Sequence, residues 1–521
     1  LTVPQMATQL AGEGVARIAL VSDDPDRYRN HPEMPARVTF DHRSRLDTVQ
    51  KELREHEGVS VLIYDQTCAT EKRRRRKRGL MEKSNRRVFI NDLVCEGCGD
   101  CTVKSNCLSV EPVETEWGRK RRIDQSSCNQ DFSCLEGFCP SFVTVEGGQL
   151  RKANADMDES RFNALPDPDL PDIADDGFNI LLTGIGGQGV TALGAMIGMA
   201  AHVDGKAVAM VDMLGMAQKG GGVHSNIRIG KPGQSLNGPR IAVGGADLIL
   251  AADIVGAAGK VTLPVAGRHR AHAIVNADLI PTAEFIKDKT VSFDYDGMVS
   301  MLGRECRALE ELPASRLATR LMGDAIYTNM LLLGFAWQKG RLPMSRAALE
   351  KAIALNGVAV EKNLQAFNWG RLFANDARAV EGFLEEGASL ARTLDEVIDR
   401  RVAFLTDYQD AAYAERYRNQ MDRVRTAEQN MAPGSTALSE AVARNLFKLM
   451  AYKDEYEVAR LYADGEFDRK LRAQFEGDFK LSFHMAPPVL SKKDPDTRLP
   501  RKRTFGPWML PVLRRVARGK G

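Results

Sequence analysis

The sequence has little cysteine, and the few cysteines are concentrated in one place. Only nine of the 521 residues are cysteine, and seven of these lie between Cys95 and Cys139. Small secreted proteins that depend on disulfides carry more cysteine for their length. We therefore expect a cytoplasmic protein whose clustered cysteines bind a metal ion or an iron–sulfur cluster.

Long apolar runs and a strong excess of one charge are also missing. The longest run, "YTNMLLLGFAW", predicts a buried helix, because a membrane span needs ~20 apolar residues. The N-terminus has no signal-peptide pattern. The 72 Lys and Arg nearly balance 69 Asp and Glu, so the whole chain is not expected to bind nucleic acid. The composition predicts a globular chain of several domains, with no membrane segment.

Apolar patterns predict two α/β regions and a helical end. "LTVPQMATQLAGEG" and "RLDTVQKELREHEG" predict helices, and "RIALVS" and "VSVLIYD" predict strands. Two parallel strands cannot bury a core alone, so residues 1–85 are expected to end a larger α/β domain. The cysteine segment spans 86–150, and an acidic, proline-rich linker spans 151–177. A Rossmann-like α/β domain is predicted over 178–375, and a mainly helical region over 376–521. The strands expected in the second α/β domain are "NILLTG", "AVAMVD", "SNIRIG", "DLILAAD", "AHAIVNAD" and "TVSFDYD".

The stretch "CEGCGDC" has the spacing of an iron–sulfur loop. Cys95, Cys98 and Cys101 follow the C-x2-C-x2-C rule, which supplies three thiolates to a [4Fe-4S] cluster. The fourth thiolate comes from elsewhere, and Cys139, which precedes a proline, is the expected fourth ligand. Zinc is the main alternative, but its motifs typically come as separated CxxC pairs. The spacing therefore favours a cubane cluster.

The other cysteines leave the number of clusters open. Cys107, Cys128 and Cys134 are also expected metal ligands, in a second cluster or in partly structural roles. Their spacings, C-x2-C-x2-C-x5-C and then C-x5-C-x4-C-P, do not form two near-identical motifs. Cys68 is either an eighth ligand or a buried thiol, and Cys306 is expected in the core.

A glycine-rich loop follows the first strand of the second α/β region. Gly184, Gly186 and Gly189 in "LLTGIGGQGVTALG" fit G-x-G-x-x-G, and Asp212 ends the next strand. A bound dinucleotide is one interpretation, and close approach to another anion or to another backbone segment is the alternative. The loop lacks the Gly-Lys-Ser/Thr of a Walker A motif. The expected cofactor-binding residues of this loop are Gly184, Gly186, Gly187, Gln188 and Gly189.

A second glycine patch, "MLGMAQKGGGVHSNIRIG", follows directly. Gly220 and Gly221 permit close backbone contact, and Lys219 adds a cation beside them. Both patches are expected at the carboxyl ends of parallel strands, where open α/β sheets build their sites. His224 is a catalytic candidate, but a lone histidine is more often simply hydrogen-bonded. No residue is predicted as a general acid or base.

The run "EKRRRRKRG" is the densest positive charge in the chain. It is compatible with a nuclear-localisation or nucleic-acid segment, or with a solvated surface. Its place between an α/β region and the cysteine segment favours an acidic partner protein or an anionic ligand.

Together these segments resemble a known family. "VLIYDQTCATEKRRRRKRG", "CEGCGDCTVKSNC", "SSCNQDFSCLEGFCPSF", "GIGGQGV" and "MAQKGGGVHSNIRIG" resemble the long, fused form of indolepyruvate ferredoxin oxidoreductase, a thiamine-diphosphate enzyme family. The resemblance covers nearly the whole chain. It implies the end of a thiamine-diphosphate domain, an Fe–S segment, a gamma-type catalytic domain and a helical C-terminal region. It also implies oxidative decarboxylation of indolepyruvate or a related aryl pyruvate to the acyl-CoA, with electrons passing through [4Fe-4S] to ferredoxin.

The resemblance also implies cofactors and partners. The cofactors are one or two [4Fe-4S] clusters, thiamine diphosphate with Mg²⁺, and coenzyme A as co-substrate. The family's Gly-Asp-Gly motif with a downstream Asn does not occur, so an upstream thiamine-diphosphate portion is expected as a partner. Ferredoxin and a second copy in a homodimer are further expected partners. A stand-alone Fe–S scaffold with a separate thiamine-diphosphate subunit is the alternative, and an NAD(P)-binding oxidoreductase is a third hypothesis.

Overall fold

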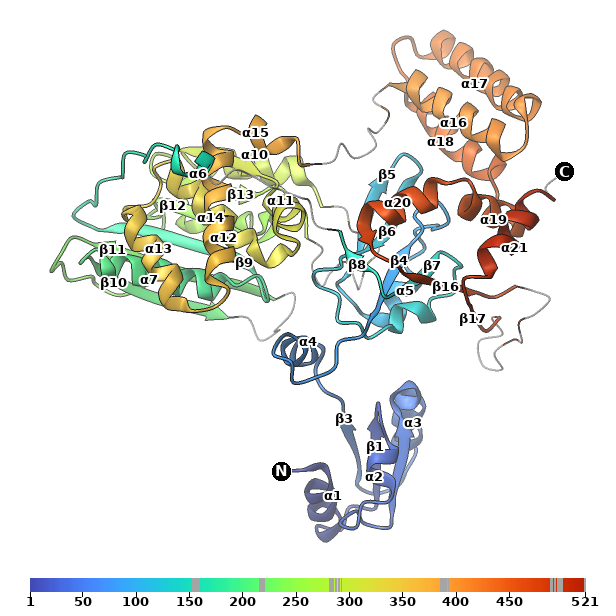
Figure 1. The fold of residues 1–521 in the computed structure, drawn as a ribbon, viewed down its shortest axis with the longest axis horizontal. Helices are drawn as coiled ribbons and strands as arrows, with labels where there is room; N and C mark the ends of the chain where they lie inside the picture. Colours follow the sequence, from blue (N-terminus) through green and yellow to red (C-terminus); the bar gives the residue numbers. More distant parts are fainter. Residues whose placement is uncertain are drawn as a thin grey trace. The chain divides into compact units, whose positions relative to one another are not determined.

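The computed structural model describes residues 1–151, 160–214, 221–280, 285, 288, 291, 293–384, 391, 393–487, 491, 493 and 500–519. They form two compact units, Leu1–Lys83 and Ser84–Gly521, each with its own core (Figure 1). No helix in these ranges is long and apolar enough to cross a membrane.

The first unit is a three-stranded parallel sheet in the order β2-β1-β3. Ile18 and Leu20 of β1 pack with α1, and Ala19 and Val21 pack with α3, because successive strand residues face opposite sides. The helix predicted to begin after Thr2 is confirmed and has a capping box. The predicted strands β1 and β3 are confirmed, whereas β2 has no counterpart among the predictions. The elements are α1 (Val3–Gly12), β1 (Arg17–Ser22), α2 (Asp26–Arg29), β2 (Val38–His42), η1 (Arg43–Arg45), α3 (Leu46–Arg54), β3 (Ser60–Asp65) and α4 (Ala69–Lys77).

The arginine run forms most of helix α4. Glu71 in its first turn accepts hydrogen bonds from Arg74 and Arg75, each at 3.0 Å. Lys72 pairs with Asp23, with 2.7 Å between Nζ and Oδ2. Part of the positive charge is therefore balanced inside the first unit.

The cysteine segment forms a small module with two antiparallel sheets. One sheet has the order β17-β16-β7-β4, and the other is the β5–β6 hairpin. The C-terminal strand β16 pairs with β7, with Leu481 opposite Val145, so the end of the chain completes this sheet. The elements are β4 (Arg86–Ile90), α5 (Asp100–Ser105), β5 (Val110–Thr115), β6 (Gly118–Ile123), η2 (Ser133–Glu136), β7 (Phe142–Glu146), β8 (Gln149–Leu150), β15 (Phe475–Glu476), β16 (Lys480–Met485) and β17 (Arg503–Phe505).

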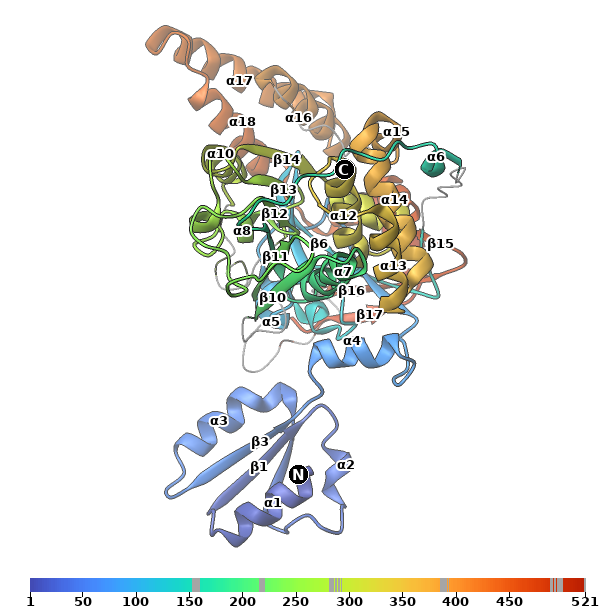
Figure 2. The same cartoon turned by 90° about the vertical axis from the view of Figure 1, so that its left-hand side faces the viewer.

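A six-stranded mixed sheet forms what we call the six-stranded domain. Its order is β10-β11-β9-β12-β13-β14, in which β9, β12, β13 and β14 are parallel and β11 is antiparallel to both neighbours. Helices α7, α12, α13 and α14 lie on one side, and α8 and α10 lie on the other (Figure 2). The elements are α6 (Ser160–Asn163), β9 (Phe178–Ile185), α7 (Val190–Val203), β10 (Ala207–Leu214), β11 (Gly222–Gly230), β12 (Leu248–Ala251), α8 (Ile254–Ala257), η3 (Leu263–Val265), β13 (His272–Asn276), α10 (Tyr295–Glu305), β14 (Ala308–Leu312), α11 (Ala314–Leu317), η4 (Ala318–Met322), η5 (Ala325–Tyr327), α12 (Thr328–Gln338), α13 (Arg346–Asn356), α14 (Val360–Asn375) and α15 (Arg378–Glu381).

Five of the six strands predicted for this domain are present. The sixth, "TVSFDYD", is wrong where it is described, because Asp294 caps α10 and Tyr295 begins it. Residues 290 and 292 of that stretch lie outside the described residues. The sixth strand of the sheet is β14, whose "ALEEL" sequence carries two glutamates in place of an apolar run. The apolar run "YTNMLLLGFAW" is confirmed as the buried helix α12.

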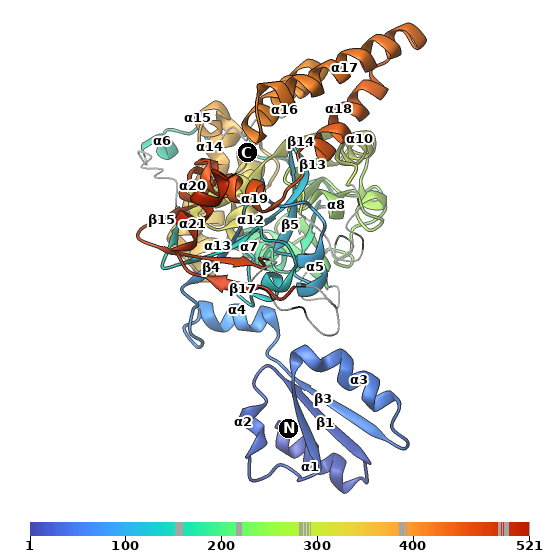
Figure 3. The same cartoon turned by 90° about the vertical axis from the view of Figure 1, so that its right-hand side faces the viewer.

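The C-terminal region is mainly helical, as expected. Figure 3 shows α16, α17 and α18 side by side, and they share an apolar core. Arg401 of α16 is buried and pairs with Glu116 of the β5–β6 turn, with 2.7 Å between Nη1 and Oε1. This pair connects the helices to the cysteine module. The helices are α16 (Leu394–Tyr408), α17 (Ala411–Met431), α18 (Ala437–Met450), α19 (Glu455–Ala463), α20 (Glu466–Gln474) and α21 (Met509–Ala517).

Candidate functional site

Six of the seven clustered cysteines share one apolar core with strands of the module. Three are buried and three are half-buried against them, and the seventh, Cys98, is exposed. Cys306 is buried in the six-stranded domain, as expected, whereas Cys68 is exposed rather than buried and lies in the first unit. The core thiols are Cys95, Cys101, Cys107, Cys128, Cys134 and Cys139.

Cys139 lies with the cysteines of the first loop. A Cβ atom on Gly137 would be only 2.8 Å from the Cα of Cys101, so the two segments touch. The amide of Phe138 donates to a carboxylate oxygen of Asp100 at 2.7 Å. Burial, together with negative charge on Cys139, Cys95 and Cys98, raises the pKa of Cys101 to about 12. The segment that carries Cys139 therefore lies against the loop that carries Cys95, Cys98 and Cys101.

The remaining three thiols form a second group. Cys134 is buried, and negative charge on Cys128 and Cys107 adds to burial in raising its pKa above the usual range. Among described residues, no three Cys, His, Asp or Glu side chains lie close enough together to bind one metal ion. Each thiolate of a cubane binds a different iron, so cluster ligands are spaced more widely than those of zinc.

A buried arginine provides positive charge beside the thiols. Arg121 is 1% exposed, and its Nε and Nη2 have no hydrogen-bond partner in the described part of the chain. Burial lowers its pKa, and negative charge on Cys101 and Cys95 raises it. Its guanidinium lies over the ring of Phe285, 4.8 Å from the centroid. Unpartnered N–H groups at this position fit an anionic cluster whose sulfurs accept hydrogen bonds.

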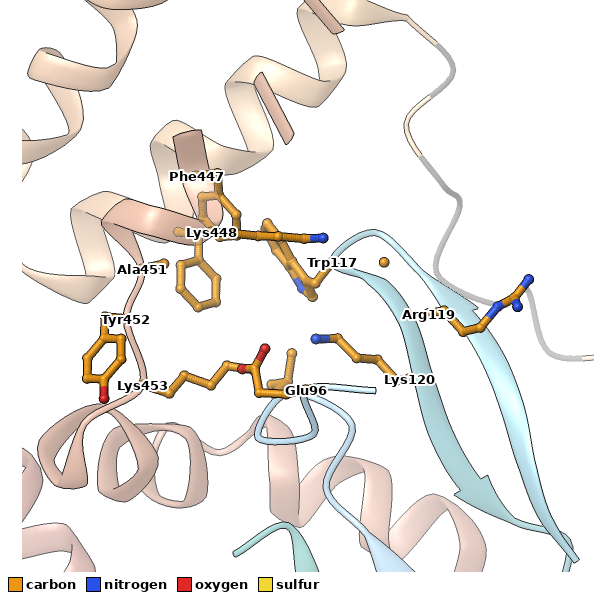
Figure 4. Close-up of a pocket in the computed structure, with 12 residues that line it drawn as sticks. Glu96, Trp117, Arg119, Lys120, Phe447, Lys448, Ala451, Tyr452 and Lys453 are labelled. Atoms are coloured by element: carbon orange, nitrogen blue, oxygen red, sulfur yellow. The ribbon is translucent and has the colours of Figure 1, made fainter. Parts of the chain in front are cut away.

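A pocket of about 470 Å³ lies beside the first cysteine loop. Figure 4 shows Glu96, Lys120 and Lys453 on one side of it and the rings of Trp117 and Phe447 on another. Lys453 pairs with Glu96, and its Nζ lies 3.4 Å from the carbonyl oxygen of Cys95. Burial and the charge of Lys453 lower the pKa of Lys120 to about 8. The pocket is therefore cationic and aromatic, and it contacts the thiol-bearing loop.

The glycine loop lies between β9 and α7. A Cβ on Gly184 would lie 2.7 Å from Cγ2 of Val190, and a Cβ on Gly189 would lie 2.8 Å from the side chain of Asn329. Gly189 also has φ +79° at the helix start, which favours glycine. Gly187 has φ +100° and no neighbour within 4 Å of a built Cβ. Close packing therefore explains why glycine is needed at positions 184 and 189, whereas Gly187 faces open space.

The two glycine patches meet at this edge of the sheet. The amide of Gly186 donates to the carbonyl of Gly221 at 2.8 Å, and the amide of Ile185 donates to the Gln188 side chain at 2.6 Å. Lys219 and Gly220 lie outside the described residues. The backbone amides of Ile185 and Gly186 therefore already donate within the protein and are not free to bind a phosphate.

The surroundings of the loop differ from a dinucleotide fold. β11 lies between β9 and β10, whereas the fingerprint expects the next strand directly beside the first. The carboxylate of Asp212 accepts a hydrogen bond from the hydroxyl of Ser225. His224 is half-buried, burial lowers its pKa, and its Nδ1 has no partner in the described part. The exposed Gly187 and the unpartnered Nδ1 of His224 are two features of this edge that contacts within the described residues do not explain.

A buried carboxylate that was not predicted from the sequence lies near the glycine loop. Asp253 follows β12 and is 1% exposed, and its Oδ2 accepts from the amide of Gly256 at 2.8 Å. Neither its Oδ1 nor the hydroxyl of Thr183 has a hydrogen-bond partner among described residues. The Asp that ends "DLILAAD" at a strand terminus is the signal that could have indicated it.

Replacing Asp253 with asparagine is expected to stabilise the six-stranded domain at neutral pH. Burial raises the pKa of Asp253 to about 6, from 3.8, so the folded state holds this proton more tightly than the unfolded state. The cost of the charged form therefore develops as pH rises from about 4 to above 6, reaching up to about 3 kcal/mol. Urea unfolding of Asp253→Asn should show this gain at pH 8 and little gain at pH 4. A gain independent of pH would contradict the explanation.

Comparisons with known proteins match the six-stranded domain and the C-terminal helical region. Residues 179–373 match the family described as pyruvate ferredoxin/flavodoxin oxidoreductase, and residues 394–521 match a family of unknown function. The chain is 30% identical over 195 residues to indolepyruvate oxidoreductase subunit IorB of Methanothermobacter thermautotrophicus, covering 37% of this chain and 95% of that protein. The chain belongs to the IorB family. This confirms the resemblance noted in the sequence over about 37% of the chain, and we now call the six-stranded domain the IorB-like domain.

Other relatives match a similar share of the chain. Subunit IorB of Pyrococcus horikoshii is 28% identical over 204 residues, covering 37% of this chain and 94% of that protein. Among solved structures, the gamma subunit of a keto/oxoacid ferredoxin oxidoreductase from Geobacter sulfurreducens is 22% identical with a TM-score of 0.28, covering 38% of this chain and 98% of its own. The 2-oxoglutarate:ferredoxin oxidoreductase from Magnetococcus marinus is 16% identical with a TM-score of 0.29, covering 38% and 31%.

Proposed function

We propose that this chain is part of a 2-oxoacid:ferredoxin oxidoreductase that oxidatively decarboxylates indolepyruvate or a related aryl pyruvate to its acyl-CoA. The observation that supports this most is the presence, in one compact unit, of an IorB-like domain and a module whose core contains six of the seven clustered cysteines. Neither feature alone points to this activity, because iron–sulfur modules and α/β domains each serve many functions.

The first group of thiols would hold a [4Fe-4S] cluster. Its ligands would be Cys95, Cys98, Cys101 and Cys139, three from one loop and the fourth from the Cys-Pro pair. When bound, such a cluster supplies one-electron transfer. The unpartnered N–H groups of Arg121 would donate to the sulfurs of a bound cluster, and the apolar core would keep water away from the buried thiols. The exposed Cys98 is the part of this site nearest to solvent.

The remaining functional parts are also proposals. The glycine loop at Gly186 and Gly187, with the second patch at Gly221, would face a cofactor or substrate at the carboxyl edge of the sheet. Thiamine diphosphate and Mg²⁺ would be bound mainly by an upstream thiamine-diphosphate portion, with coenzyme A as co-substrate. Ferredoxin would receive the electrons, and two copies would form a homodimer. Under this proposal the chain alone is incomplete for decarboxylation.

Anaerobically purified protein is expected to be brown and to contain about four iron atoms per bound cluster. Cys101→Ala should lower the iron content by about four atoms per chain, whereas Cys306→Ala should not, because Cys306 lies in a separate core. Iron and sulfide analysis, with visible absorption, measures both. Colourless protein containing zinc would overturn the proposal.

Activity requires a second measurement. The loaded chain should reduce ferredoxin with indolepyruvate and coenzyme A only when a thiamine-diphosphate subunit of the same family is added. A loaded chain that stays inactive with every aryl and branched 2-oxoacid would favour the alternative, an Fe–S scaffold protein. Saturable, tight binding of NADH at the glycine loop would instead support the dinucleotide hypothesis.

A further inference from the structure

The cysteine module contains the same loop twice. Two residues after its first cysteine, each loop has a residue in the left-handed region: Gly97 with φ +66° and Gln130 with φ +53°. Four residues after that cysteine the same occurs at Gly99, with φ +79°, and at Phe132, with φ +66°. The loops thus share their backbone conformation although their sequences differ.

The hydrogen bonds of the two loops also correspond. The amide of Gly97 donates to Sγ of Cys95 at 3.3 Å, and the amide of Gln130 donates to Sγ of Cys128 at 3.4 Å. Each loop then enters a helical turn, α5 or η2, capped by its second left-handed residue. An amide that donates to a cysteine sulfur is typical of loops that wrap iron–sulfur clusters.

The backbone match equates residues of the two loops by position. Cys95 corresponds to Cys128 and Cys101 to Cys134, at the same places in each loop. Cys98, the middle ligand of the first loop, corresponds to Asp131. Gln130 and Phe132, on either side of Asp131, have left-handed backbone, which costs of order 1 kcal/mol for each non-glycine residue. The second loop therefore keeps the shape of the first loop although its local backbone conformation is unfavourable.

The strand pairing shows which distant cysteine reaches each loop. β4 precedes the first loop and pairs with β7, which follows the second; β5 follows the first loop and pairs with β6, which precedes the second. Each half of the module, a loop with its two flanking strands, therefore pairs both of its strands with strands of the other half. Gly137, two residues before Cys139 of the second half, lies against Cys101, and Cys107 from the first half shares a core with Cys134 and adds to its pKa shift. The second loop with Cys107 then offers three thiols, from Cys107, Cys128 and Cys134, and one carboxylate, from Asp131.

We propose that the module holds a second cubane cluster whose ligands are Cys107, Cys128, Cys134 and the carboxylate of Asp131. This inference rests on the proposed electron-transfer function and adds the identity of the second site. A carboxylate oxygen is a harder ligand than a thiolate, so the iron that it binds is held less firmly. That iron is the one expected to leave on mild oxidation. The change is [4Fe-4S]²⁺ → [3Fe-4S]⁺ + Fe²⁺ + one electron, and added ferricyanide accepts the electron.

The neighbours of Asp131 are suited to a ligand role. The hydroxyl of Ser133 donates to its Oδ2 and orients the carboxylate. Asp131 is half-buried, and the guanidinium of Arg86 lies over the adjacent Phe132 ring, 4.7 Å from the centroid. A guanidinium beside this loop would favour the anionic form of a cluster bound here.

The test uses the full chain, reconstituted with iron and sulfide under anaerobic conditions. Wild type is expected to hold about eight iron atoms and, after ferricyanide, to show the EPR signal of about one [3Fe-4S] cluster per chain. Asp131→Cys should keep about eight iron atoms and lose that signal, because a fourth thiolate retains the iron. Asp131→Ala should show the signal without added oxidant. Glu136→Ala, an exposed acid on the same segment, should behave like wild type.

The outcomes separate this inference from the proposed function. Wild type with about four iron atoms, all lost in Cys101→Ala, would overturn the second site and leave the first. An equal [3Fe-4S] signal in wild type and Asp131→Cys would overturn the role of Asp131. Protein that takes up no iron at all would overturn the proposed function itself.

Discussion

Replacing Gly370 with alanine is expected to destabilise the IorB-like domain by about 3 kcal/mol or more, and Gly370→Leu is expected to leave the chain insoluble. Gly370 lies where α14 crosses α12, and a Cβ there would be 2.0 Å from the carbonyl oxygen of Leu331. On the facing helix, a Cβ on Gly334 would be 1.8 Å from the carbonyl oxygen of Phe367. Both obstacles are backbone atoms, so the helices would have to separate. Urea unfolding followed by tryptophan fluorescence measures the effect, because Trp337 is buried at this contact.

A glycine elsewhere in the same domain provides the control. Gly303 lies in helix α10 with no atom within 4 Å of a built Cβ. Gly303→Ala should therefore stabilise the domain by about 0.5–1 kcal/mol, because alanine favours the helix. If Gly370→Ala unfolds at the same urea concentration as wild type, the close crossing of α12 and α14 is wrong.

The second large effect is expected from Gly137→Val, which should remove about four iron atoms per chain. A side chain at Gly137 would lie 2.8 Å from Cα and 3.0 Å from N of Cys101, so the segment carrying Cys139 must move away. The first cluster would then lose its fourth thiolate. Iron analysis and visible absorption of anaerobic protein measure the loss.

The neighbouring residue gives a matched comparison for this variant. Glu136 is exposed, and Glu136→Ala should retain the full iron content. Gly137→Val with unchanged iron would show that the contact between the two loops is not needed to hold the cluster. Circular dichroism of both variants should match wild type, which separates cluster loss from unfolding of the whole chain.

Local patterns were sufficient for much of the fold. Continuous apolar runs predict β9, β12 and β13 because these strands are buried on both faces. The edge strand β14 was not predicted because its two glutamates interrupt the apolar pattern that indicates a strand. β16 was missed because its partner, β7, is far away in the sequence, and pairing over such a separation leaves no local signal. The fingerprint at Gly184 predicts the turn, but it does not reveal that β11 lies beside β9.

The candidate site shows a similar limit. Counting cysteines predicts the first loop from Cys95 to Cys101, because all three expected ligands there are cysteines. The same count conceals the second loop, where the middle position is Asp131 and the spacing reads as C-x5-C. Only the backbone, with left-handed residues at matching places, reveals the repeat. Asp253 was missed for a different reason, since its burial depends on strands and helices that meet only in the folded domain.

The pairing of β16 with β7 has a consequence for biosynthesis. When the ribosome has made the cysteine segment, β7 still has an unpaired edge, because Lys480–Met485 emerges more than 300 residues later. The IorB-like domain is synthesised in between and can fold first, since domains generally fold as units during translation. Under the proposed function, iron and sulfide would therefore enter a finished module only after Lys480–Met485 has left the ribosome.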